Sequence, residues 1–224
     1  QSVVTEEQVT ALDLPASDGD GNPLNWMVLL TEQALIDDKG LMPGLDRDLE
    51  LTDEALAWLG SDLDELLLPL KLSDPVKQTS KEKLISLLLD VQDKQTQLLE
   101  ALFQETAKLP SDCAVAVVHW AHSSVYGILG DALSFTENDS LLIENFQRVS
   151  RHAEIVLQLR LSNRALRLFV INPTWLGNYP NVNSEPALSD LYLLERFSHW
   201  LHGQTRSEDA LLNYFSLANP PAPK

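Results

Sequence analysis

The feature that most constrains this chain is an apolar stripe of helical spacing between about Ser80 and Lys108. Its members recur every three or four residues, which places them on one face of a helix. They are Leu84, Leu87, Leu88, Val91, Leu98, Leu102 and Phe103. The opposite side is polar. At about 1.5 Å per residue this helix would be roughly 40 Å long, so we expect it to organise the core.

Helical spacing recurs along nearly the whole chain, and no segment alternates convincingly between apolar and polar residues. Ser111, Ser162 and Ser207 stand where helix caps are expected, and Pro110 and Pro173 stand where helices should stop. The sequence therefore predicts an all-α fold. We expect an irregular stack of about eight helices with one long central helix, shell-like or solenoid-like in arrangement.

The predicted domain organisation is simple. Residues 1–22 are expected to be a flexible lead-in, residues 23–219 a single α-helical domain with a sub-boundary near 110, and residues 220–224 a proline-rich tail. The chain begins with Gln1 and shows no signal peptide, which indicates a processed or excised piece. Its longest apolar runs are too short to span a bilayer.

The net charge of −17 argues against binding to nucleic acids or anionic membranes, because phosphates would be repelled. The charge is uneven. Residues 1–110 carry 22 acidic and 8 basic side chains, and residues 111–224 carry 11 and 8. Two ordinary solvated surfaces explain this better than an acidic half that binds a basic half.

The chain carries no recognisable catalytic signature. Cys113 is the only cysteine, so the fold cannot depend on an intramolecular disulfide and is expected to form in a cytoplasm. We find no phosphate-binding, dinucleotide-binding or nucleophile-elbow motif. The run D-G-D-G-N at 18–22 lacks the glycine and glutamate that a calcium loop requires, so a polar turn is the better interpretation. We predict a non-enzymatic protein without a cofactor.

Two histidine pairs are the sharpest candidate site. His119 with His122, and His199 with His202, have i,i+3 spacing near predicted helix ends. Such pairs could share a metal, but neither has the glutamate of an H-E-x-x-H motif, so packing or capping is favoured. Their ordinary pKa near 6.5 also makes them candidates for pH-responsive or interface residues.

Arginine and aromatic residues provide further candidates. Arg160, Arg164 and Arg167 would share one helix face if 160–167 were continuous, and could contact an acidic partner, although Ser162 interrupts that stretch. Ordinary surface ion pairs are the simpler interpretation. The scattered aromatic residues are predicted core or lid residues, of which an exposed pair would indicate an interface: Trp58, Trp120, Trp175, Tyr179 and Trp200.

Two long stretches carry a family resemblance. FQRVSRHAEIVLQLRLSNRALRLFVINPTWLG at 146–177 and LSDLYLLERFSHWLHGQTRSEDALLNYFSLAN at 188–219 resemble consecutive segments of the A components of bacterial Tc toxin complexes. Residues 29–42, 81–109 and 119–129 share the same leucine-rich character. The resemblance implies a piece of an α-helical shell around a translocation channel, in a large secreted or cell-surface pentamer that opens with pH.

That resemblance sets the leading hypothesis. The chain would be a non-catalytic structural piece of such a toxin component, with other copies of the component and a host cell-surface receptor as partners. The alternative is a helical-repeat scaffold unrelated to toxins, which binds a protein through a concave face. A metal-dependent enzyme that uses the histidine pairs is the third and weakest hypothesis.

Overall fold

The computed structural model describes residues 2–43, 53–134, 140–172, 175 and 188–219. Within these ranges the regular structure is helical, with ten α-helices, two short 3-10 helices, one isolated bridge and no strand. The predicted all-α fold is therefore confirmed. The predicted tail, 220–224, and Tyr179 lie outside the described residues.

The chain separates into two compact units. The first contains Gln1–Leu99 and Val125–Leu133, and the second contains Glu100–Ser124 and Ser134–Lys224. The sequence predicted one domain with a sub-boundary near 110. The continuous part of the first unit instead ends at Leu99, and the unit also includes the later helix Val125–Leu133. The order of the sequence alone does not indicate this grouping.

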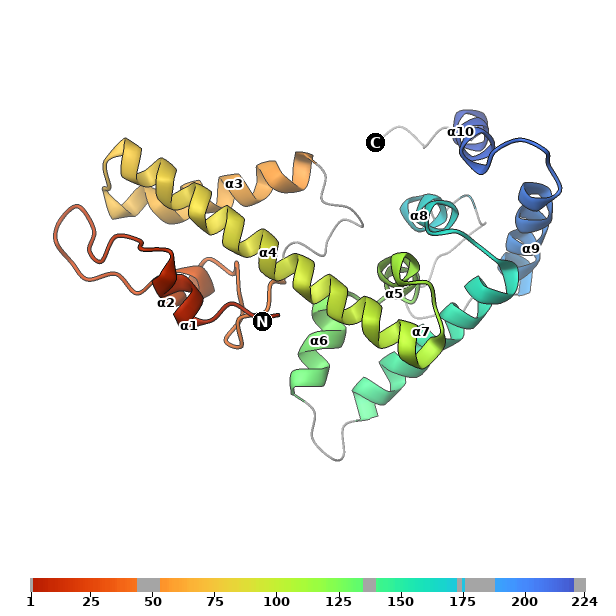
Figure 1. The fold of residues 1–224 in the computed structure, drawn as a ribbon, viewed down its shortest axis with the longest axis horizontal. Coiled ribbons are helices and arrows are strands. Elements are labelled where there is room, and N and C mark those ends of the chain that lie inside the picture. The colour runs from red at the N-terminus through yellow and green to blue at the C-terminus, as the bar shows by residue number, and fades with distance from the viewer. Residues whose placement is uncertain (1, 44–52, 135–139, 173–174, 176–187, 220–224) are drawn as a thin grey trace. The chain divides into compact units, whose positions relative to one another are not determined.

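The first unit is built on the long helix of the chain (Figure 1). Its elements are α1 (Glu6–Ala11), α2 (Trp26–Glu32), α3 (Asp53–Leu67), η1 (Leu68–Leu70), the first part of α4 (Asp74–Ala107) and α6 (Val125–Leu133). Thr5 and Gln8 cap α1 reciprocally, and the Asn25 side chain caps α2. These local signals fix where the short helices begin.

Helix α4 is longer than the sequence predicted. It has 34 residues and begins at Asp74, whereas the apolar stripe predicts a start near Ser80. Pro75 lies in its first turn. Proline is tolerated in the first turn of a helix, where its missing N–H has no intrahelical acceptor, so it marks a start as readily as a break.

The buried stripe of α4 also differs from the predicted one. Leu98 is 48% exposed, whereas the neighbouring Leu99 is fully buried, so the stripe prediction is wrong at Leu98. The true stripe passes through Gln95, which is only 2% exposed. Its amide Nε2 donates to the carbonyl oxygen of Ser2 at 2.9 Å. A polar residue therefore continues an apolar face because its hydrogen bond is made inside the protein.

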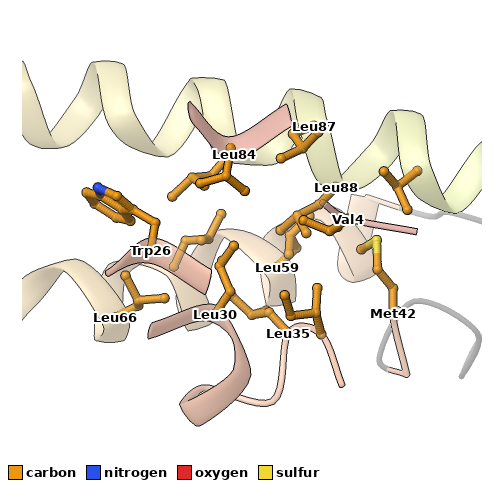
Figure 2. Packing of buried hydrophobic residues seen from close by; sticks show 14 of the residues in the cluster. Val4, Trp26, Leu30, Leu35, Met42, Leu59, Leu66, Leu84, Leu87 and Leu88 are labelled. Atoms are coloured by element: carbon orange, nitrogen blue, oxygen red, sulfur yellow. The ribbon is translucent and has the colours of Figure 1, made fainter. Parts of the chain in front are cut away.

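The core of the first unit forms between α4 and the shorter helices. Figure 2 shows Leu84, Leu87 and Leu88 projecting from α4 toward side chains of α2 and α3, among them Leu30 and Leu59. Leu84, Leu88, Leu30 and Leu59 are at most 1% exposed. Burial of a leucine side chain contributes about 1.5–3 kcal/mol, so this cluster stabilises the unit.

The predicted flexible lead-in differs from the structure. It contains α1, and both Val4 and Val9 are buried in the core. The Val4 N–H donates to the Gly40 carbonyl at 2.8 Å, and Lys83 Nζ donates to the Leu12 carbonyl at 2.6 Å. The segment is held both by these two buried valines and by hydrogen bonds to its backbone groups, of which the latter leave no mark in its side-chain pattern.

The second unit consists of shorter helices packed on one another (Figure 1). α5 packs against α7 and α8, and α7 contacts α9. Phe103, at the end of α4, stacks on Phe146 with ring centroids 5.0 Å apart. Its elements are the end of α4, η2 (Ser111–Cys113), α5 (Ala114–Trp120), α7 (Ser140–Leu159), α8 (Asn163–Ile171), α9 (Leu188–His202) and α10 (Glu208–Ala218).

Several helices end at a residue other than glycine in the left-handed conformation. Ala34, Lys108, His122 and Arg160 have φ between 50° and 57° at the ends of α2, α4, α5 and α7. The N–H of the following residue reaches back over a full turn, as in Leu161 N to Val156 O at 3.0 Å. This is the Schellman arrangement, which satisfies carbonyls that a helix end leaves unpaired.

The position of Leu88 in the core generates a stability prediction. Replacement Leu88→Asp buries an unpaired charge and should lower the free energy of unfolding by roughly 3 kcal/mol or more. Leu98→Asp places the same side chain on the exposed side of α4 and should cost less than about 1 kcal/mol. Urea denaturation followed by circular dichroism measures both. Equal losses in the two variants would contradict the stripe described above.

Gly40 and Gly21 provide a matched pair for backbone strain. Both have positive φ, 81° and 87°, but a Cβ on Gly40 would lie 2.2 Å from the Val4 carbonyl oxygen, whereas a Cβ on Gly21 would meet nothing within 4 Å. Gly21→Ala should therefore cost only the conformational strain, about 1 kcal/mol. Gly40→Ala should cost roughly 3 kcal/mol or more, because the backbone must also move. Thermal melts that rank the two in the opposite order would refute this account.

Candidate interface surface

The first histidine pair lies at the end of α5. His119 is half-buried in the last turn, and His122 occupies the left-handed position of the Schellman end, with the Ser123 N–H donating to the Val118 carbonyl at 3.0 Å. His122 therefore takes part in ending the helix, which is the capping interpretation favoured from the sequence.

The pKa of His122 lies below its ordinary value of 6.5, because partial burial disfavours the charged form and because the nearby Arg148 guanidinium repels a second positive charge. The unfolded chain therefore takes up a proton at His122 more readily than the folded chain does. Consequently, this residue makes the free energy of unfolding fall as the pH drops below about 6.5.

The second histidine pair lies in the last turn of α9, of which His202 is the final residue. His202 Nδ1 lies 2.9 Å from the Ser198 carbonyl oxygen, and Ser198 Oγ donates to the Leu159 carbonyl at 2.6 Å. His199 is largely exposed, with Nε2 3.8 Å from a Glu195 carboxylate oxygen. The described residues bring no three His, Cys, Asp or Glu side chains together as a metal site would require.

The arginine stripe is broken. α7 ends at Leu159, Arg160 takes the left-handed position after it, and the Ser162 side chain caps α8. Arg164 Nη1 lies 2.5 Å from Asp209 Oδ1 of α10, and Arg167 donates to Asn163 within its own helix. Arg164 thus contacts an acidic residue of the same chain, and the three arginines do not form one continuous surface.

Cys113 and the D-G-D-G-N turn serve the fold. Burial, followed by the charge of Asp112, raises the pKa of the Cys113 thiol to about 12, and Arg167 offsets this only in part. Asp18 Oδ1 accepts hydrogen bonds from the N–H groups of Asp20 and Asn22. The Asn22 side chain, chiefly, lowers the pKa of Asp18. The Cys113 thiol therefore stays protonated. The Asp18 carboxylate accepts hydrogen bonds from within its own turn.

A groove in the second unit was not predicted as a site from the sequence. Three helices of the second unit line an open groove of about 520 Å³, to which α8 contributes Phe169, α9 contributes Phe197 and Trp200, and α10 contributes Tyr214 and Phe215. We call this the aromatic groove. Trp175, which follows α8, also lines it.

The rings of the aromatic groove contact one another. The Phe215 ring centroid lies 5.1 Å from Phe197, 5.4 Å from Trp175 and 6.2 Å from Trp200. Phe169 packs edge-on against Phe197 at 4.7 Å. Phe169 and Phe197 are buried, whereas Tyr214 is 66% exposed. The inner rings thus form the floor and the outer ones remain accessible, the arrangement in which aromatic residues recognise partners.

Exposed apolar side chains gather in the second unit. Of the fourteen exposed large hydrophobic residues in the described part of the chain, nine belong to this unit. Leu188 at the start of α9 is 86% exposed, and Leu217 in α10 is 82% exposed. Five of the nine lie on α9 and α10, and they are Leu188, Tyr192, Leu193, Tyr214 and Leu217.

No described helix is by itself long and apolar enough to cross a membrane. The consecutive helices Ser111–Trp120 and Val125–Leu133 reach the required length and composition only when they are taken together.

Comparison with known proteins gives one informative match, and no family model matches the chain. The chain is similar to the toxin subunit YenA1 of Yersinia entomophaga, with 21% identity over 206 residues. The alignment covers 87% of this chain but only 17% of that protein, so the chain spans a small part of the relative's length. The similarity is distant and relates the chain to a toxin subunit, in agreement with the resemblance to toxin A components.

A titration tests the environment of His122. Arg148→Gln removes the repelling charge, so the pKa of His122, followed by NMR of its ring protons, should rise toward 6.5. Arg206→Gln makes the same change of charge at an exposed position and should leave the His122 titration unchanged. A His122 pKa at or above 6.5 in the unaltered chain would contradict the assignment.

Proposed function

We propose that this chain is a non-catalytic structural piece of a toxin A component, which contributes to a helical shell and to contacts between copies of that component. The observation that carries the proposal is the similarity to a toxin subunit over most of this chain and a small part of the relative. A piece of a larger assembly needs surfaces that other parts can cover, and the exposed apolar residues of α9 and α10 are suited to this.

The electrostatics support contact with protein in preference to nucleic acid. The chain carries a net charge of −17, and Arg164 and Lys81, two of its basic side chains, are paired with the carboxylates Asp209 and Asp64. Release from the producing cell, assembly as a pentamer and attachment to a host cell surface belong to the same proposal, because the resemblance to toxin A components implies them. A helical scaffold unrelated to toxins is the alternative, and it predicts a monomer that binds an unlike protein.

Self-association of the 224-residue chain tests the proposal. Sedimentation over a range from about 1 to 200 μM should show weak, concentration-dependent association, since exposed apolar residues such as Leu188 and Leu217 would be covered by another copy. The double variant Leu188→Asp, Leu217→Asp should weaken the association at least tenfold, because charges would enter the contact.

A matched control separates interface effects from a general effect of added charge. Leu68 is 71% exposed but lies in the first unit, so Leu68→Asp should leave the association unchanged. A chain that stays monomeric at every concentration, or an equal loss with Leu68→Asp, would contradict contacts between copies through α9 and α10.

A further inference from the structure

Among the described residues that line the aromatic groove, Arg196 of α9 is the one charged residue. Its Nη1 donates to the Tyr192 hydroxyl at 3.1 Å, and its guanidinium carbon lies 5.7 Å from the centre of the Tyr192 ring. Tyr192 stands one turn earlier on the same helix, so it orients the guanidinium without neutralising it. The neighbouring Glu195 approaches His199 instead, at 3.8 Å, and Arg196 forms no ion pair with a described carboxylate.

The groove has the form of a seat for a helix. Its residues on α9 recur at spacings of three and four, and they are Leu193, Arg196, Phe197 and Trp200. They form one stripe of about two helical turns, or about 10 Å. On α10, Tyr214 and Ala218 stand one turn apart and also line the groove. A groove between two such stripes accepts the apolar face of a further amphipathic helix.

The second unit already holds one of its own helices by this chemistry. α10 packs on α8 with the Phe215 and Phe169 ring centroids 5.9 Å apart, and Arg164 of α8 pairs with Asp209 of α10 at 2.5 Å. Arg164 also donates to Asn213, one turn further along α10, at 3.2 Å. An arginine beside aromatic rings is thus satisfied here by a helix that brings apolar side chains together with a carboxylate.

We propose that the aromatic groove binds an amphipathic helix of a different protein, whose apolar stripe packs on the rings and whose carboxylate pairs with Arg196. The net charge of −17 would repel a strongly acidic partner, so the groove selects one well-placed carboxylate and not a high negative charge. Arginine suits this role, because its planar guanidinium matches the geometry of a carboxylate. The inference does not rest on the toxin-related role, since it follows from the groove residues alone.

A designed helix tests the proposal. The peptide A-Q-L-A-Q-L-A-Q-E-L-A-Q-L-Q, acetylated and amidated, carries leucines on one helical face and a single glutamate beside them. Added to the isotopically labelled chain, it should shift the indole N–H signals of Trp175 and Trp200 in NMR spectra until they saturate. The same peptide with glutamine in place of glutamate should bind at least about threefold more weakly, because the pair with Arg196 is lost.

Three variants separate the charge from the rings. Arg196→Gln should bind the two peptides equally. Arg206→Gln makes the same change of charge at an exposed position outside the groove, and should keep the preference for glutamate. Tyr214→Ala removes a ring that is 66% exposed, so it should weaken both peptides at least about fivefold and leave their ratio unchanged. Circular dichroism melts check that each variant is folded.

Each of three results would overturn the proposal. No saturable shift at Trp200 with millimolar peptide would show that the groove does not accept a helix. A preference for glutamate that persists in Arg196→Gln would show that another cation pairs with the peptide. Self-association that the peptide abolishes would assign the groove to a second copy of this chain in place of a different protein. The proposed shell contacts are tested separately at Leu188 and Leu217, which do not line the groove.

Discussion

The first unit depends on a single buried face of α4. The side chains of Leu84 and Leu88 fill the space between that helix and the shorter ones, and each short helix has little stability without it, since isolated helices of this length are marginal in water. The same face carries Gln95, whose hydrogen bond to Ser2 links the start of the chain to its longest element. The same face of α4 therefore packs against the shorter helices and holds the start of the chain.

The fold class could be predicted from sequence because it rests on periodicity, which is a local property. The errors in predicting helix bounds and buried positions also arose from local features of the sequence. Helix α4 begins at Asp74, before the predicted Ser80, because proline is tolerated in a first turn, and the buried face passes through Gln95 and Leu99, whereas the predicted stripe contains Leu98. Helix ends at Lys108 and Arg160 have no glycine to mark them. Such ends depend on the buried leucine that follows each of them, Leu109 and Leu161.

The candidate site, unlike the fold class, could not be predicted from the sequence. The histidine pairs and the arginines were visible as motifs, yet His122 and Arg160 end helices and Arg164 pairs with α10. The aromatic groove could not be predicted, because its residues lie between 169 and 219 in a pattern that only the packing of three helices brings together. Its one sequence signal was the expectation that exposed aromatic residues would indicate an interface.

The way the first residues are attached has a consequence for how this protein can diverge. Gln95, Lys83 and Trp26 hold the segment through the carbonyl oxygens of Ser2, Leu12 and Pro15, which every amino acid carries. Related chains could therefore differ at Ser2 and still keep this hydrogen bond, provided that the donor Gln95 persists. A substitution at that donor, 93 positions away, would release the start of the chain more readily than a substitution at Ser2 itself. The buried Val4 and Val9, by contrast, remain constrained by the core around them.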